Sequence, residues 1–383
     1  MIHFIVALDA LVIVPFSSIM TLHVGADASQ AGYLVSAYAI AAAITCLFTK
    51  GSPDLNREIK RVCFYLVGIT LTTFFTALVS DFNMLILCRV LTGFFGGSLA
   101  VVNLNYLILI SSEEERKQNT AILLSSFPLA LAVGVPSLIM LSSGSNWQLG
   151  FQVIGSALVL VGVLLFISTR NKAENNSQEF VCSSDKKLLL AEALSNRVVC
   201  CSVMLIFSAV LGTFLVSTQF PVMLSVNLSI SPKLLSFCYV LSGICSFIAM
   251  QYYGRVKMSD ITVGRIIILL SIVMAVSMVL GFRTINVDLA AVAFIAFIIV
   301  SSTRTLILVT ELICSLPIKE RMLLISMQNS MQHFAVGLGG MLSSLLIHSR
   351  SDSSLDFTNL IFAALIMAIF TPMLWIRYRK NSY

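Results

Sequence analysis

The chain has 383 residues, of which 58% are hydrophobic and 11% are charged, with a net charge of +6 and a mean hydropathy of +0.96. A soluble domain is about 45–50% apolar and about 25% charged, so this composition excludes an ordinary soluble globular protein. Apolar runs of about 20 residues recur along the chain, and a run of that length spans the hydrocarbon core of a bilayer. The composition therefore predicts a polytopic helical membrane protein.

Hydropathy and helix-breaking residues divide the chain into twelve expected spans. These lie at 2–22, 30–49, 62–80, 84–110, 120–141, 150–169, 199–221, 232–253, 262–281, 287–313, 322–347 and 357–376. A polar segment at 170–198 is expected to be a flexible cytoplasmic linker between six-helix bundles at 1–169 and 199–383. The two stretches "LILISSEEERKQNTAILLS" (107–125) and "ELICSLPIKERMLLISMQ" (311–328) end spans four and ten in a similar way, which indicates an internal repeat.

The distribution of lysine and arginine predicts the orientation. With the N-terminus in the cytoplasm, nineteen of the 24 basic residues fall in cytoplasmic segments, three fall in outer loops, and Arg89 and Arg304 fall inside spans. Cytoplasmic loops of membrane proteins carry such an excess of positive charge. We therefore expect an inner (plasma) membrane protein with both termini in the cytoplasm.

Four charged residues are expected deep in the membrane, and each needs a partner or water because such a residue costs about 2.5–3.5 kcal/mol on insertion scales. They are Asp9, Arg89, Arg304 and Glu311. Asp9 in span one and Arg89 in span four lie at depths that a long arginine side chain bridges, which favours an ion pair. Two roles remain open for this pair, namely proton coupling through a protonatable Asp9 and a static bridge between two helices.

Polar residues inside the spans are the candidates for a substrate cavity. Span eleven carries Ser326, Asn329, Ser330, His333 and Gly337 on one helical face, which is typical of a cavity wall or a helix contact. Two roles stay open for His333. One is a ligand or proton role, because histidine titrates near neutral pH, and the other is that of a hydrogen-bonded structural residue. The full set of expected cavity residues is Tyr33, Tyr38, Asn103, Gln219, Arg304, Glu311, Asn329 and His333.

Several stretches resemble motifs of the major facilitator superfamily, in particular its twelve-span drug:proton antiporter group. They are "ALDALVIVPFSSIM" (7–20), "SQAGYLVSAYAI" (29–40), "LILCRVLTGFFGG" (85–97), "LAVGVPSLIM" (131–140) and "NWQLGF" (146–151). The resemblance implies an all-α membrane protein with the major facilitator fold, in which twelve transmembrane helices form two pseudo-symmetric six-helix bundles. It also implies proton-coupled efflux, by alternating access, of a small amphipathic compound such as a drug, a siderophore-like metabolite or a sugar derivative.

The same resemblance implies gating roles for four residues. Gly51 and Asp54 lie in "KGSPDLNREIKR" (50–61), which is similar to the family's loop between spans two and three, and Gly134 and Pro136 lie in the span-five motif. Asp54 follows Gly51 by three residues where the family has four, and Pro136 lies one residue late. Because of these departures, two alternatives stay open: nutrient uptake on the same fold, and a non-transporting receptor or assembly factor.

Other function classes lack support in the sequence. There is no Walker-type phosphate-binding loop and no large segment outside the spans, so we expect neither ATP hydrolysis nor any other enzyme activity. The nine cysteines lie mostly in apolar runs and form no CxxC pair, which argues against a disulfide framework or a metal site. The expected partners are a small-molecule substrate, protons and the lipid bilayer, with no cofactor and no nucleic acid, and the protein is expected to be a monomer.

Overall fold

The computed structural model describes residues 1–383 apart from 50–51, 53, 113–118, 120–122, 124–125, 143–145, 171–196, 256–258, 316–317, 351–353 and 382–383. The N-terminal helices are α1 (Ile2–His23), η1 (Ala28–Gln30), α2 (Ala31–Phe48), α3 (Leu55–Leu78), α4 (Phe82–Ile110), α6 (Ser126–Leu129), η2 (Ala130–Gly134), α7 (Val135–Leu141) and α8 (Trp147–Arg170). The C-terminal helices are α10 (Arg197–Ser217), α11 (Phe220–Val226), α12 (Pro232–Arg255), α13 (Asp260–Arg283), α14 (Val287–Ser315), α15 (Ile318–Leu345) and α16 (Thr358–Asn381). Two short strands, β1 (His348–Ser349) and β2 (Leu355–Asp356), pair as an antiparallel hairpin between α15 and α16.

Among the described residues, ten helices are long and apolar enough to cross a membrane. The expected fifth span is divided into α6, the π-helical turn η2 and α7, of which Ala130–Leu141 forms a shorter apolar helix. The expected eleventh span, α15, has 28 residues, but its polar face lowers its hydropathy. The chain is an all-α membrane protein, as the sequence predicts.

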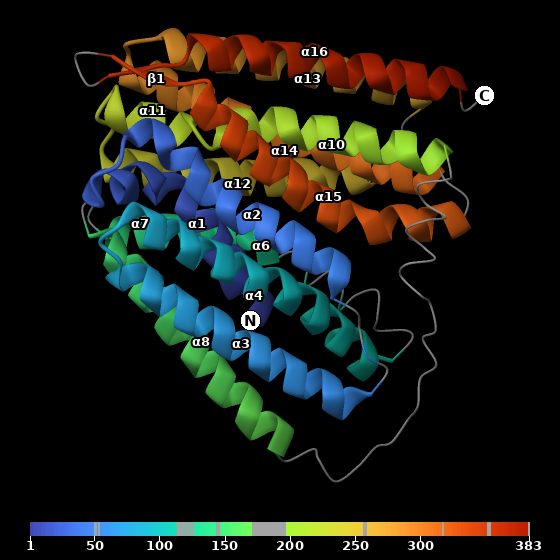
Figure 1. Cartoon of the computed structure of the whole chain (residues 1–383). Coiled ribbons are helices and arrows are strands. Elements are labelled where there is room, and N and C mark those ends of the chain that lie inside the picture. The colour runs from blue at the N-terminus through green and yellow to red at the C-terminus, as the bar shows by residue number, and fades with distance from the viewer. Residues whose placement is uncertain are drawn as a thin grey trace.

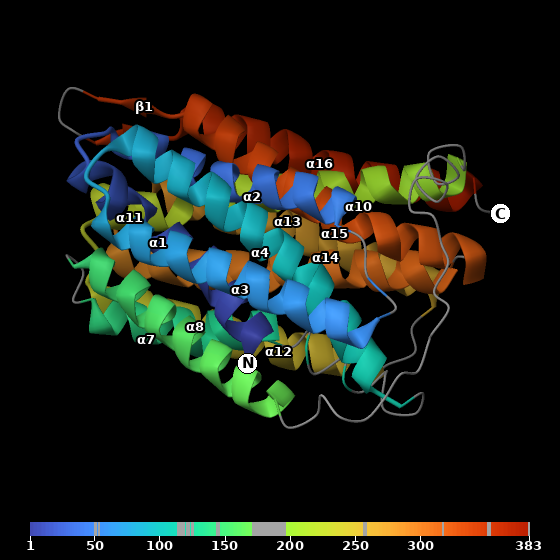
Figure 2. The same ribbon diagram turned by 60° about the horizontal axis from the view of Figure 1, so that its bottom comes forward.

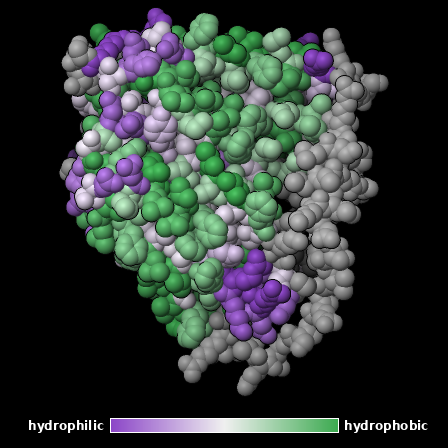
Figure 3. Space-filling view, viewed as in Figure 1, coloured by the Kyte–Doolittle hydropathy of each residue, from purple (hydrophilic) through white to green (hydrophobic). Residues whose placement is uncertain are grey.

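Helix α3 shows how the sequence sorts side chains between lipid and protein. Phe64, Leu71 and Phe75 share one helical face and are each more than half exposed, whereas Leu66 and Ile69 on the opposite face are buried. An exposed apolar stripe of this kind is typical of a helix face in contact with lipid. Figure 3 shows a largely hydrophobic surface, with hydrophilic residues gathered towards the ends of the molecule.

The N-terminal and C-terminal helices meet at one end of the molecule, which we call the hairpin end because the β1–β2 hairpin lies there (Figures 1 and 2). Helix α2 packs on α15, α7 packs on α12, and α1 contacts α11. Away from this end, α3, α4 and α8 slope away from the C-terminal helices in Figure 1. The two groups of helices therefore diverge towards the end at which α16 finishes.

Three pairs of helices have equal lengths in the two parts of the chain. Helices α3 and α13 both have 24 residues, α4 and α14 both have 29, and α8 and α16 both have 24. These matches support the predicted internal repeat. The predicted domain boundaries stay a prediction, and most of the predicted linker, at 171–196, lies outside the described residues.

A hydrogen bond joins the two groups at the hairpin end. The Ser349 hydroxyl in β1 lies 2.8 and 2.6 Å from the two carboxylate oxygens of Asp27, which precedes η1. The bonds from Ser349 and from the backbone of Ser29 hold the pKa of Asp27 below its usual range. The contact with Ser349 is therefore stronger when the Asp27 carboxylate is ionised than when it is protonated.

Because the pKa of Asp27 is lowered, the stabilisation is complete above the ordinary value of about 3.9 and is lost as the pH falls through the lowered pKa. We expect spin labels at Ala26→Cys and Ser354→Cys to report the same distance distribution from about pH 8 to about pH 5. Asp27→Asn is expected to broaden the distribution at every pH, because the neutral amide is a weaker acceptor. Broadening between these pH values in the protein with Asp27 would contradict the assignment.

Candidate functional site

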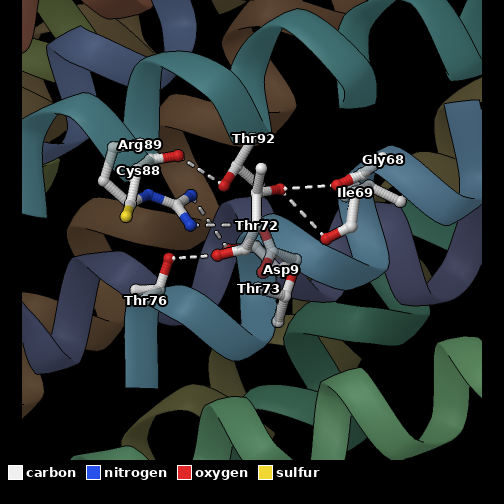
Figure 4. A network of polar contacts seen from close by, with 9 residues as sticks. All are labelled: Asp9, Gly68, Ile69, Thr72, Thr73, Thr76, Cys88, Arg89 and Thr92. Carbon is white, nitrogen blue, oxygen red and sulfur yellow. Dashed lines mark hydrogen bonds and ion pairs between the residues drawn. The ribbon is translucent and has the colours of Figure 1, made fainter. Parts of the chain in front are cut away.

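An ion pair is buried among the N-terminal helices. Nη1 of Arg89 in α4 lies 3.3 Å from Oδ2 of Asp9 in α1, and Nη2 lies 3.5 Å from the Asp9 backbone oxygen. Both side chains are fully buried. The ion pair predicted from the sequence is therefore present, and Figure 4 shows it between α4 and α1.

A third helix completes the surroundings of the Asp9 carboxylate. The hydroxyl of Thr73 in α3 donates to Oδ1 of Asp9 at 3.2 Å, so each carboxylate oxygen has one hydrogen-bond donor (Figure 4). The ring of Tyr38 in α2 lies 5.0 Å from the guanidinium carbon of Arg89, which is a cation–π contact. These contacts join α1, α3 and α4 at the Asp9 carboxylate, and the Tyr38 ring adds α2. Sequence reasoning missed Thr73, although the threonine-rich run "TLTTFFT" (70–76) was an available signal.

Arg304 is a second buried guanidinium, and it lies among the C-terminal helices. Its Nη1 donates to Ser271 in α13 at 3.4 Å and its Nη2 donates to the backbone oxygen of Ala209 in α10 at 3.2 Å. Within the part of the chain that the structure describes, it has no acidic partner. Arg304 lies 17 residues after the start of α14, whereas Arg89 lies 7 after the start of α4, so Arg304 is about 15 Å further from the hairpin end.

Glu311 has partners other than Arg304. It accepts a hydrogen bond from the hydroxyl of Tyr253 in α12, and Arg379 in α16 lies 3.7 Å from its second oxygen. The guanidinium of Arg379 also lies over the ring of Trp375. The structure therefore separates Glu311 from the Asp9 site and places it where α12, α14 and α16 meet.

Glu58 is a fully buried carboxylate that sequence reasoning missed. Arg61 lies 2.9 Å from one of its oxygens, and the side-chain amide of Asn105 donates to the other at 2.6 Å. The same amide also bonds to the backbone oxygen of Ser52, which ties the segment before α3 to α4. The available signal was the Glu58–Arg61 spacing of three residues, which forms ion pairs on helices.

The four predicted gating residues have different surroundings. Asp54 is exposed and caps α3 by accepting a hydrogen bond from the backbone of Asn56. Gly134 ends η2 beside Leu8, and the backbone oxygen of Pro136 accepts a hydrogen bond from Ser236 of α12 at 3.1 Å. Pro136 is thus part of the contact between the two groups of helices, while Gly51 lies outside the described residues.

The remaining predicted cavity residues are spread over both groups of helices. Tyr33 and His333 are half-buried, Asn103 is buried, and the side chain of Asn329 lies outside the description. Gln219 is fully buried at the interruption between α10 and α11, where its side-chain amide donates to Ser343 of α15 at 3.0 Å. Gln219 is therefore the predicted cavity residue with a defined polar environment near α15.

In the part of the chain that the structure describes, long apolar helices, a buried ion pair and two groups of helices that meet at one end define a helical membrane carrier fold. The chain belongs to the Major Facilitator Superfamily, whose sequence pattern matches residues 1–315. It is therefore a transporter and not an enzyme, with a small-molecule substrate and a membrane environment.

Solved structures share this fold at low sequence identity. A bacterial homolog of the human lysosomal transporter Spinster, in an inward-facing and occupied conformation, has a TM-score of 0.72 and 14% identity, covering 99% of this chain and 95% of that one. The unoccupied form has a TM-score of 0.69, 12% identity and coverage of 100% and 94%. A mutant of the nucleoside transporter NupG has a TM-score of 0.67, 14% identity and coverage of 99% and 98%.

Proposed function

We propose that the protein is a proton-coupled secondary transporter that exports a small amphipathic compound by alternating access, as a monomer in the inner (plasma) membrane. The observation that carries the proposal is the buried Asp9–Arg89 pair. Ionised Asp9 holds Arg89, and protonated Asp9 releases it, so proton binding changes the contacts between α1 and α4. That change is the kind of differential interaction that shifts a conformational equilibrium.

The excess of basic residues in the segments that the sequence assigns to the cytoplasmic side supports an orientation with both termini in the cytoplasm. In that orientation the contacts at the hairpin end close the outer side, as in an inward-facing carrier. The low content of charged residues, 11% of the chain, supports a substrate that is not strongly ionic. A drug, a siderophore-like metabolite or a sugar derivative meets this condition. Export of such compounds also agrees with the resemblance of the sequence motifs to the drug:proton antiporter group.

Proton movement during transport tests the proposal. In everted membrane vesicles with an imposed pH gradient, addition of a transported compound is expected to release protons, which a pH-sensitive dye measures. Asp9→Asn is expected to lower this proton release at least about tenfold while exchange of the compound continues, because the amide cannot bind a proton at this site. Asp81→Asn is the matched control, since Asp81 caps α4 and asparagine is an equally good cap.

Three outcomes would overturn parts of the proposal. Proton release that survives Asp9→Asn would make the ion pair a static bridge between helices. Accumulation of the compound only in right-side-out vesicles would favour nutrient uptake. A nucleoside transporter has a similar fold, which is why this alternative is tested. If deletion of the protein changes the cell's phenotype but no compound is found to be transported, a receptor or an assembly factor is favoured.

A further inference from the structure

The seventh membrane segment is interrupted close to the hairpin end. Helix α10 ends at Ser217, and α11 begins at Phe220 with Pro221 in its first turn. Proline lacks a backbone N–H and is favoured in the first turn of a helix, so Pro221 favours the start of a new helix here. Thr218 and Gln219 form the turn, and both are fully buried. In a membrane, such irregular backbone is stable where protein covers it or where it lines a cavity.

Four polar side chains meet at this interruption, and we call Thr218, Gln219, Ser343 and Ser344 the Gln219 cluster. The Gln219 amide nitrogen donates to Ser343 at 3.0 Å and to Ser344 at 3.5 Å. The hydroxyl of Thr218 lies 3.1 Å from that of Ser343, which donates to the backbone oxygen of Gly340. All four side chains belong to residues that are at most 6% exposed.

One strong acceptor of the cluster is unused. The amide oxygen of Gln219 is buried and has no hydrogen-bond partner among the described residues. An unpaired buried carbonyl of this kind costs about 1–3 kcal/mol. Because the hydrogen bonds and ion pairs of the described residues bring no charged side chain to the cluster, the unused acceptor is in a neutral environment.

The N-terminal helices cover this cluster in the present conformation. Gly32 of α2 lies so close that a methyl group on it would overlap the backbone oxygen of Gly340 and lie 2.7 Å from the hydroxyl oxygen of Ser343. The cover therefore depends on the absence of a side chain at Gly32. Separation of α2 from α15, which opens the hairpin end, would uncover Ser343 and Ser344 first.

We propose that the Gln219 cluster is a substrate-binding subsite that accepts a hydrogen bond from a neutral hydroxyl or amide group of the transported molecule when the hairpin end opens. This inference rests on the proposed transport function. The Gln219 amide oxygen is the acceptor, and the hydroxyl groups of Ser343 and Ser344 orient the amide. Gly32 covers the subsite in the present conformation, in which the hairpin end is closed.

Binding measurements with defined probes test the subsite. Full-length protein in lipid nanodiscs is titrated with uridine and with n-octyl-β-D-glucoside, which carry neutral donors, and with tetraphenylphosphonium, which carries none. Gln219→Met is expected to weaken binding of the first two by about threefold to tenfold, the effect of one neutral hydrogen bond, and to leave tetraphenylphosphonium unchanged. Gln148→Met is the matched control, because Gln148 of α8 bonds to His23 away from the cluster.

A labelling experiment keeps the proposal testable if Gln219→Met folds poorly. In a background without native cysteines, Ser344→Cys is expected to react with maleimide more slowly in the presence of uridine or n-octyl-β-D-glucoside, whereas Ser271→Cys beside Arg304 is expected to show no such protection.

Equal binding of the hydroxyl probes by the unsubstituted protein and by the Gln219→Met variant, without protection at position 344, would overturn the subsite. Transport of tetraphenylphosphonium without binding of either hydroxyl probe would also overturn it and leave transport intact. Failure to transport any of the three would instead count against the proposed function.

Discussion

Substitution of Arg89 by methionine is expected to lower the free energy of unfolding by about 3–5 kcal/mol, because it leaves the Asp9 carboxylate buried without its cation. Thr73 still donates to Asp9, but a neutral hydroxyl does not replace a guanidinium. The double variant Asp9→Asn/Arg89→Met is expected to recover most of this loss, since a neutral pair of similar volume carries no charge desolvation cost. Unfolding of the four proteins in one detergent measures the coupling energy.

Arg304→Met is the matched control for this cycle. Arg304 is as deeply buried as Arg89, but its contacts are with a hydroxyl and a backbone oxygen. Its replacement therefore leaves no buried carboxylate, and we expect a change within about 1 kcal/mol. Strictly additive effects of Asp9→Asn and Arg89→Met would contradict a stabilising pair.

The second large effect is expected at Gly32, where a leucine would force α2 away from α15 at the hairpin end. A Cβ at Gly32 overlaps the backbone oxygen of Gly340, and a Cβ at Gly340 would lie 2.8 Å from the backbone oxygen of Gly32. Backbone atoms cannot rotate away, so relief requires the helices to separate. Overpacking of this kind costs about 1–3 kcal/mol, which changes the ratio of the two conformations by about fivefold to 150-fold.

Accessibility at position 344 measures this shift. Ser344→Cys is expected to react with an impermeant thiol reagent at least about fivefold faster when Gly32→Leu is present. Gly264→Ala is the control, since a Cβ there would lie 3.7 Å from the Trp375 side chain, an ordinary contact. An unchanged rate in a folded Gly32→Leu protein would mean that α2 does not close the hairpin end.

The sequence predicts the fold well because most of the spans are long apolar runs, which face lipid and are therefore easily recognised. The Asp9–Arg89 pair was also predictable, because two opposite charges at similar depth in a membrane have few other ways to be stable. The division of span five into α6, η2 and α7 was not, since hydropathy does not report the hydrogen-bonding register of the backbone.

Side-chain partners were harder to predict than depth. Glu58 lies in a basic stretch that reads as a solvated loop, yet Asn105 of α4 bonds to its fully buried carboxylate. Arg304 and Glu311 lie two helical turns apart and share a stripe, but helix packing directs one to Ser271 and the other to Tyr253. Such choices depend on how neighbouring helices rotate about their axes, which a single sequence does not specify.

We expect the positive charge of Arg304 to make the transport cycle sensitive to membrane voltage. Among the described residues it has no acidic partner, so it acts as a fixed charge in the membrane field. One elementary charge that crosses the whole field does about 2.3 kcal/mol of electrical work per 100 mV, so movement through a tenth of it does about 0.2 kcal/mol. The Asp9–Arg89 pair adds no net charge while Asp9 is ionised and adds one positive charge once Asp9 binds a proton. If Asp9 is protonated as we propose, we therefore expect the membrane potential to favour the conformation that brings both guanidinium groups nearer to the negative side.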